Sequence, residues 1–177
     1  MRVLIVVLAV VLLVLALVLV ATYNRFVRQR TLVDESWGQT DVELTRRHDL
    51  VPNLVATVQG YAAHERQVLE ALALARETAQ AHRRDSPAAR QGYEQALGGA
   101  VRDTLVRSEA YPELRASAHF LQLQTELTDT EDRIAAARRF YNGNVRAYNT
   151  RIATFPSNLV AGLFGFRRAA FFELAEP

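Results

Sequence analysis

The stretch VLIVVLAVVLLVLALVLVA, which begins at Val3 and ends at Ala21, decides the fold of this chain. Its 19 residues are all apolar and include no glycine or proline. As an α-helix it is ~28 Å long, close to the ~30 Å hydrocarbon core of a bilayer. A helix also satisfies its own backbone hydrogen bonds, as the lipid interior requires. We therefore predict a single transmembrane helix, with residues 1–22 as the membrane anchor.

A cleaved signal peptide is the alternative for an apolar N-terminus. The apolar region of a signal peptide has about 7–15 residues and is followed by an Ala-x-Ala cleavage site. The present stretch is longer and no such site follows it, which favours a retained anchor.

The residues that flank the anchor indicate its orientation. Tyr23 takes the place of an interfacial aromatic residue, and Arg25, Arg28 and Arg30 follow it, whereas the N-terminal side offers Arg2 and the α-amine. Positive residues are enriched on the cytoplasmic side of a membrane helix. We predict a single-pass protein of the cell membrane (inner or plasma), with the soluble domain in the cytoplasm.

Composition narrows the classes of function. The 177 residues include no cysteine, which excludes disulfides, thiolate metal sites and cysteine nucleophiles. The 21 basic residues are interleaved with 19 acidic ones, and the net charge is +2. Binding to nucleic acid needs clustered positive charge. We expect no nucleic-acid partner and no small-molecule substrate.

Beyond the anchor, apolar residues recur at alternating spacings of three and four. The pattern runs from Phe26 to Ala75 and again from Phe120 to Phe155, and strands do not produce it. The predicted fold is all-α: an N-terminal transmembrane helix followed by an elongated antiparallel bundle of four helical segments with coiled-coil-like heptads. We expect the bundle over residues 23–154, with segments near 24–48, 49–83, 87–110 and 117–154.

Pro52 interrupts the first heptad stretch. Proline lacks a backbone donor and clashes with the preceding turn, so a kink or a break is expected. Asp49 would cap a new helix with Pro52 in its first turn, which allows a reversal of the chain. The heptad phase nevertheless passes from Leu44 to Val51 and Leu54 unchanged, which favours a kink.

Charged residues occupy several heptad positions: Arg30, Arg47, Glu65, Glu131 and Arg138. One interpretation places them at the edges of the seam with their charges in water. The other pairs them across helices, for example Arg47 or Arg138 with an opposing glutamate, where they would set the register of the helices more than add stability. Trp37 is a further candidate for contact with a second copy of the chain.

Residues 155–177 form a phenylalanine-rich C-terminal segment with five phenylalanines by position 172. This segment is too apolar for a disordered tail. It folds back on the bundle, or it lies on the membrane surface or binds a partner, since aromatic and arginine side chains suit both. The candidate interaction residues are Phe164, Phe166, Phe171 and Phe172.

Several blocks follow one another in the order of a known family. They are VDESW (33–37), RRHDLVPNLV (46–55), YPEL (111–114), ARRFYN (137–142), FPSN (155–158) and FFE (171–173). With these blocks the chain resembles the LemA family over essentially its whole length. The resemblance implies an N-terminal anchor with a short outward N-terminus and an antiparallel helical bundle, and it brings no catalytic residue.

The sequence offers no convincing site for catalysis or metal binding. His64 and Glu65 resemble the start of a zinc-protease motif, but position 68 is valine where the second histidine is required. His48 and Asp49 would need Glu35 or His64 as further ligands, and 16 residues separate the two histidines. We predict no enzyme activity, no catalytic residue and no metal or cofactor.

Two functions remain as hypotheses. The first is a membrane-tethered scaffold, whose partners are the lipid bilayer, further copies of the chain in a homo-oligomer, and other membrane proteins. A tether favours such contacts because it raises the effective concentration. The second is membrane-surface remodelling or lipid sensing through the Phe/Arg-rich C-terminal segment.

Overall fold

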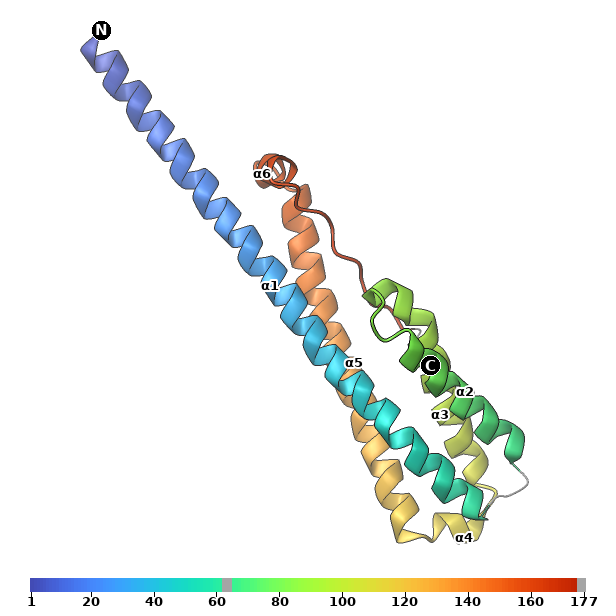
Figure 1. The fold of residues 1–177 in the computed structure, drawn as a ribbon. Helices are drawn as coiled ribbons and strands as arrows, with labels where there is room; N and C mark the ends of the chain where they lie inside the picture. Colours follow the sequence, from blue (N-terminus) through green and yellow to red (C-terminus); the bar gives the residue numbers. More distant parts are fainter. Residues whose placement is uncertain (62–64, 175–177) are drawn as a thin grey trace.

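The structure is a computed structural model that describes residues 1–61 and 65–174. Within these residues every regular element is a helix, which confirms the predicted all-α class (Figure 1). The helices are α1 (Arg2–Tyr61), α2 (Arg66–Ala81), α3 (Pro87–Ser108), α4 (Pro112–Arg115), α5 (Ala118–Ala153) and α6 (Ser157–Leu163).

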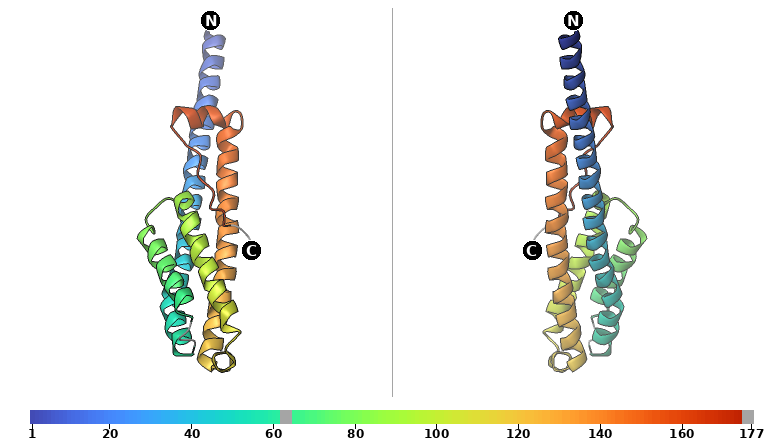
Figure 2. Two further views of the ribbon diagram at one scale, coloured as in Figure 1. Left: turned by 90° about the vertical axis from the view of Figure 1, so that its right-hand side faces the viewer. Right: turned by 90° about the vertical axis from the view of Figure 1, so that its left-hand side faces the viewer.

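The long helices α1 and α5 lie antiparallel and make the most extensive contact of the fold (Figures 1 and 2). The shorter pair α2 and α3 packs beside the end of this pair that is distant from the N-terminus, and α4 links α3 to α5 there. At the other end, α6 lies across the end of α5 and beside α1. The N-terminal part of α1 extends beyond the other described helices (Figure 1).

Two apolar cores stabilise this arrangement. The first joins α1, α2, α3 and α5 in the four-helix part and includes Leu54, Leu72, Leu97 and Leu127. The second lies between α1, α5 and the C-terminal segment and includes Phe26, Leu44, Ile134, Val145 and Phe172. The predicted heptad residues of α1 are thus largely buried; coiled-coil packing in the strict sense stays a prediction.

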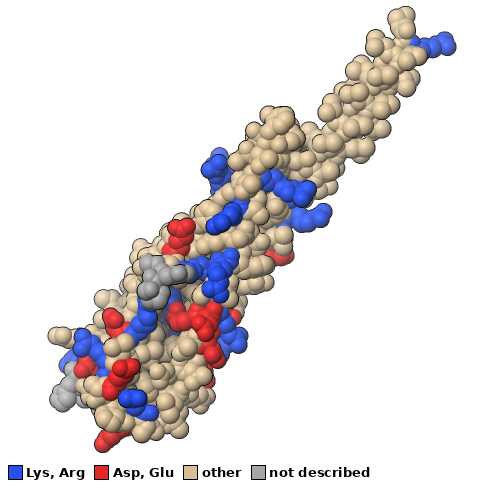
Figure 3. All heavy atoms as spheres, turned by 180° about the vertical axis from the view of Figure 1, so that it is seen from behind, with Lys and Arg blue, Asp and Glu red and all other residues tan. Residues whose placement is uncertain are grey.

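The N-terminal part of α1 has the properties of a membrane span. Among the described residues, α1 is the one helix long and apolar enough to cross a bilayer, and its most apolar 18-residue window is entirely unburied. Val3 and Ala21 are both exposed. Figure 3 shows this part as a rod that is free of charge except at its tip, while charged side chains gather over the bundle. Lipid is the environment that suits such a surface.

Pro52 does not end α1, which runs continuously from Arg2 to Tyr61. The chain reverses only between Tyr61 and Arg66, so the predicted segments 24–48 and 49–83 are wrong: their boundary lies about a dozen residues later. The alternative of a reversal at Pro52 with a cap from Asp49 is therefore wrong, and the helix continues through the proline as the unchanged heptad phase favoured. His64 lies outside the described residues.

A side chain from α2 replaces the hydrogen bond that Pro52 cannot make. In a regular helix the N–H of residue 52 would donate to the carbonyl of His48. Nε of Arg76 donates to that carbonyl instead, at 2.8 Å. Since an unpaired buried carbonyl costs free energy, this contact favours helix over a break at the proline.

Candidate functional site

A cluster of buried charges joins α1, α3 and α5 where the two apolar cores meet. Arg47, Arg90 and Glu94 are each at most 2% exposed. Glu94 accepts from both arginines: its Oε2 lies 2.8 Å from Nη2 of Arg47, and its Oε1 lies 3.1 Å from Nη2 of Arg90. Nη1 of Arg47 also lies 3.0 Å from Oε1 of Glu131 on α5. One carboxylate thus connects two buried guanidinium groups.

The ring of His48 completes the surroundings of Glu94. Its Nε2 lies 3.0 Å from Oε2 of Glu94. Burial alone would raise the pKa of the Glu94 carboxyl, but the hydrogen bond with His48 and the positive charge of Arg47 prevail and lower the pKa to about 2. Glu94 is therefore ionised throughout the physiological pH range.

The outer end of the cluster reaches Asp41 and Trp37 on α1. Nη1 of Arg90 donates to Oδ1 of Asp41 at 2.7 Å, and Arg83 approaches the same carboxylate at 3.5 Å. The guanidinium of Arg90 lies 5.2 Å from the centre of the Trp37 ring, within range of a cation–π interaction. The cluster therefore ties α3 to two successive turns of α1.

Gly98 makes room for this cluster on α3. A Cβ atom at this position would lie 2.9 Å from Nη1 of Arg47, closer than side chains approach one another. The guanidinium is held from both sides by Glu94 and Glu131, so it has little freedom to retreat. The neighbouring Gly99 has open space around its Cα.

The cluster is arranged to hold helices together. A cavity of about 290 Å³ opens beside it, but the two carboxylates of the cluster that line this cavity, Glu94 and Glu131, both accept hydrogen bonds from Arg47. Within residues 1–61 and 65–174, no three histidine, aspartate or glutamate side chains converge as metal ligands would. Opposed charges in a low-dielectric interior make any other register of α1 and α3 costly.

The predicted charged heptad residues fall into different environments. Arg47 pairs across helices with Glu94 and Glu131, which is the second of the two interpretations. Glu65 accepts from the hydroxyl of Tyr111 at 3.0 Å, and Arg138 donates to the carbonyl of Leu174. Ion pairs and hydrogen bonds of these charged residues thus connect the helices of the bundle and reach the C-terminal segment.

The C-terminal segment folds back along α5 and is held there by two asparagines. The side-chain amide of Asn142 both donates to and accepts from the backbone of Phe172, at 2.9 Å each. Asn149 makes the same pair of bonds with Ala169. Sequence reasoning missed both residues, although the Tyr-Asn dipeptide that repeats after seven positions was the available signal. The hydroxyl of Tyr141 adds a bond to the carbonyl of Ala170 at 2.7 Å.

The phenylalanines of this segment divide between core and surface. Phe172 is fully buried, 5.2 Å from Trp37, and Phe166 stacks on Phe26 at 4.8 Å between ring centres. Phe171 is half-buried in the same core. Phe164 remains 46% exposed beside Tyr23. Trp37 and Phe172 are therefore packed against each other within one chain, and contact of either with a second copy stays a prediction.

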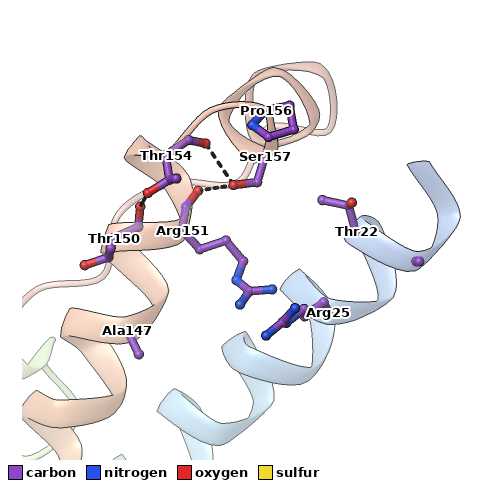
Figure 4. A pocket seen from close by; sticks show the side chains of 9 residues that line it. Thr22, Arg25, Ala147, Thr150, Arg151, Thr154, Pro156 and Ser157 are labelled. Atoms are coloured by element: carbon purple, nitrogen blue, oxygen red, sulfur yellow. Dashed lines mark hydrogen bonds between the residues drawn. The ribbon is translucent and has the colours of Figure 1, made fainter. Parts of the chain in front are cut away.

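Exposed apolar residues surround α6, at the end where α1 leaves the molecule. Phe155, Leu159 and Leu163 are 74%, 63% and 70% exposed. Of the predicted interface residues of α1, Tyr23 contacts Phe164, and Arg25 faces the end of α5 across a pocket (Figure 4). The predicted anchor residues and the C-terminal segment thus meet at one end of the bundle.

Comparison with known proteins agrees with this architecture. The sequence profile of the LemA family matches residues 36–177. The magnetosome protein MamQ of Magnetospirillum gryphiswaldense is 24% identical over an alignment that covers 88% of this chain and 66% of that protein. MamQ 1 of Paramagnetospirillum magneticum is 33% identical over 46% of this chain and 30% of its own length.

A protein named LemA from Metamycoplasma hominis is 40% identical over 38% of this chain and 31% of its own length. The chain thus spans between about a third and two thirds of the length of these relatives. With a family match over most of its residues and an all-helical fold that carries an apolar N-terminal helix, the chain belongs to the LemA family.

Proposed function

We propose that this protein is a membrane-tethered scaffold that presents a rigid helical bundle close to the bilayer. The observation that carries the proposal is the continuity of α1: one 60-residue helix serves as the anchor in its first third and as a core element of the bundle in the remainder. A bundle joined in this way is held at a fixed height and direction relative to the membrane.

The buried charges support this proposal. Arg47, Arg90 and Glu94 set the register of α1 against α3 and α5, so the outer faces of the bundle keep a constant shape. A constant shape favours recognition by partners because little ordering is needed on binding. The names of the related proteins state no reaction, in keeping with a non-catalytic role.

Cysteine crosslinking in cells tests the scaffold. The chain contains no cysteine, so single cysteines at exposed apolar positions report contacts without background. Val42, Leu74 and Phe140 lie on α1, α2 and α5 and are each more than half exposed. At least one of the three substitutions to cysteine is expected to crosslink to a second copy or to another membrane protein. A strict monomer without a co-purifying protein would refute the scaffold.

The same variants test the orientation. With the soluble domain in the cytoplasm, Val42→Cys is protected from a membrane-impermeant maleimide in intact cells and reacts after permeabilisation. Reaction in intact cells would place the bundle outside.

A second candidate function is lipid sensing through the C-terminal segment. The exposed side chains of Leu159 and Leu163 on α6, next to the predicted end of the span, favour it. A bimane label on Leu159→Cys is expected to be quenched by brominated lipids in nanodiscs, whereas the same label on Leu121→Cys, at the far end of α5, stays unquenched. Equal quenching at both positions, or none at position 159, would refute contact between α6 and the bilayer.

A further inference from the structure

A pocket of about 400 Å³ lies between α1, the end of α5 and the start of α6 (Figure 4). Arg25 and Thr22 reach it from α1, and Arg151 reaches it from α5. The side chain of Arg151 extends across the gap toward Arg25, and Thr22 points toward α5 one turn closer to the anchor. The pocket therefore gathers two guanidinium groups and, from α1, the hydroxyl-bearing side chain of Thr22.

The described residues do not compensate the charges in this pocket. None of the described residues that line it is acidic, and no ion pair to either arginine is found in residues 1–61 and 65–174. Nε of Arg151 is buried and has no hydrogen-bond partner among the described residues. Burial, followed by the nearby charge of Arg25, lowers the pKa of Arg151. Two like charges facing each other across a pocket are unfavourable unless an anion lies between them.

The residues with hydroxyl groups that line the pocket are Thr22, Thr150, Thr154 and Ser157. Thr154 and Ser157 donate to the backbone carbonyls of Thr150 and Arg151 on α5, at 2.8 Å each, and the hydroxyl of Thr150 is directed away from α1 (Figure 4). Thr22 lines the pocket from α1, and its hydroxyl has no hydrogen bond to the described residues (Figure 4). Thr22 therefore retains a donor for a ligand beside the two guanidinium groups.

The position of the pocket relative to the membrane identifies the anion. Arg25 lies four residues after Ala21, the last residue of the apolar stretch, which corresponds to ~6 Å along a helix. The headgroup region of a bilayer extends ~5–7 Å beyond each side of the hydrocarbon core. The exposed Leu159 and Leu163 of α6 border the same end of the molecule. The abundant anion at this depth is the phosphate of a phospholipid.

We propose that Arg25 and Arg151, with the hydroxyl of Thr22, bind the phosphate group of an anionic phospholipid headgroup between α1 and α5. The shared chemistry is that of a phosphate, which guanidinium groups bind through paired, charge-assisted hydrogen bonds. The inference rests on α1 as the membrane anchor of the proposed function and is independent of self-association. A bound headgroup would join the end of α5 to the membrane surface.

Native mass spectrometry of the full chain ejected from nanodiscs tests the proposal. The nanodiscs contain equal amounts of phosphatidylglycerol and phosphatidylcholine. The wild-type chain is expected to retain phosphatidylglycerol preferentially, and Arg25→Gln/Arg151→Gln is expected to reduce this preference about tenfold, since charge-assisted hydrogen bonds carry that much affinity. Unchanged retention in this double variant would overturn the proposal.

A matched double variant separates a specific site from general attraction to the surface. Arg28→Gln/Arg146→Gln removes the same charge from the same two helices at exposed side chains outside the pocket. It is expected to keep the preference within about twofold, because neither side chain lines the pocket. General surface attraction to anionic lipid depends on total charge and would fall equally in both double variants. An equal loss in both double variants would show a non-specific charge effect and overturn the site.

A second arm distinguishes the lipid from free phosphate. In uncharged detergent, short-chain phosphatidylglycerol is expected to raise the melting temperature of the wild-type chain and to leave that of Arg25→Gln/Arg151→Gln unchanged. Inorganic phosphate at matched ionic strength is expected to give a smaller shift. If phosphate alone gives the full shift, the ligand is a soluble anion and the lipid assignment is wrong. Cysteine crosslinking of the same variants reports self-association, so that a failure of lipid binding is distinguished from a failure of the scaffold proposal.

Discussion

Replacement of Glu94 by glutamine is the sharpest test of the buried charge cluster. The change keeps the shape of the side chain and removes the one carboxylate that contacts Arg47, Arg90 and His48. The remaining counter-ions, Asp41 and Glu131, are 29% and 40% exposed and each contact one arginine of the pair. Two guanidinium groups then stay buried with partial compensation.

The expected loss of stability follows both from the burial of this ion pair and from the pKa of Glu94. Loss of one partner from a buried ion pair costs ~3–5 kcal/mol. Independently, the fall in the pKa of Glu94 from the ordinary 4.5 to about 2 corresponds to ~3 kcal/mol at ~1.4 kcal/mol for each pKa unit. We therefore expect the free energy of unfolding to fall by ~3 kcal/mol or more in Glu94→Gln.

The pH dependence follows from the same carboxylate. Its pKa is lower in the folded state than in the unfolded state, so its contribution is complete above pH 4.5 and is lost as the pH falls from 4.5 toward 2. The wild-type chain should therefore lose ~3 kcal/mol more than Glu94→Gln over this range, because the variant lacks the titrating group.

Urea unfolding of the full chain in detergent, followed by circular dichroism and by fluorescence of Trp37, measures both effects. Trp37 is the single tryptophan and lies over Arg90, so its emission reports the cluster directly. Glu70→Gln is the matched control: it breaks the exposed pair with Arg66 and is expected to change stability by less than ~0.5 kcal/mol. Stability of Glu94→Gln within ~1 kcal/mol of wild type at pH 7 would refute the reasoning.

Three further predictions concern the helices and the C-terminal segment. Arg76→Gln should destabilise the chain by ~1–3 kcal/mol in urea unfolding, and Pro52→Ala should remove most of that cost, since alanine restores the missing donor. An Arg76→Gln effect that persists in full with Pro52→Ala would contradict this role. Gly98→Ala should lower the melting temperature through its clash with a held guanidinium, whereas Gly99→Ala should raise it by helix propensity; a rise in both would refute the clash. Asn142→Ala should speed amide exchange at residues 169–174 while α3 keeps its protection, and unchanged exchange there would show that the asparagine does not hold the segment.

Much of the secondary structure was predictable because its signals are local. The anchor and the helices α3 and α5 follow from apolar runs, spacing and caps within neighbouring turns, such as Ser86 before Pro87. The segment boundary predicted near residue 48 is wrong for a tertiary reason. Pro52 leaves the carbonyl of His48 without its helical donor, and an arginine 24 residues later supplies a donor to that carbonyl, so the helix continues.

The residues that form the charge cluster and the pocket were predictable from the sequence only in part. Arg47 stood out because a charge at an apolar heptad position needs a partner, and the fold supplies Glu94 and Glu131, 47 and 84 positions away. No nearby sequence feature indicates that Arg25 and Arg151 are neighbours in the fold, because nothing distinguishes this pair from the other pairs among the 21 arginines.

The sequence by itself determined where this protein resides and what it is made of: 19 unbroken apolar residues require a non-aqueous environment, and the heptad spacing requires helices. The tertiary structure alone decided which charges face one another. Ion pairs and the pocket between α1 and α5 depend on how distant helices are aligned, and that alignment arises from packing of whole faces rather than from any short stretch of the chain.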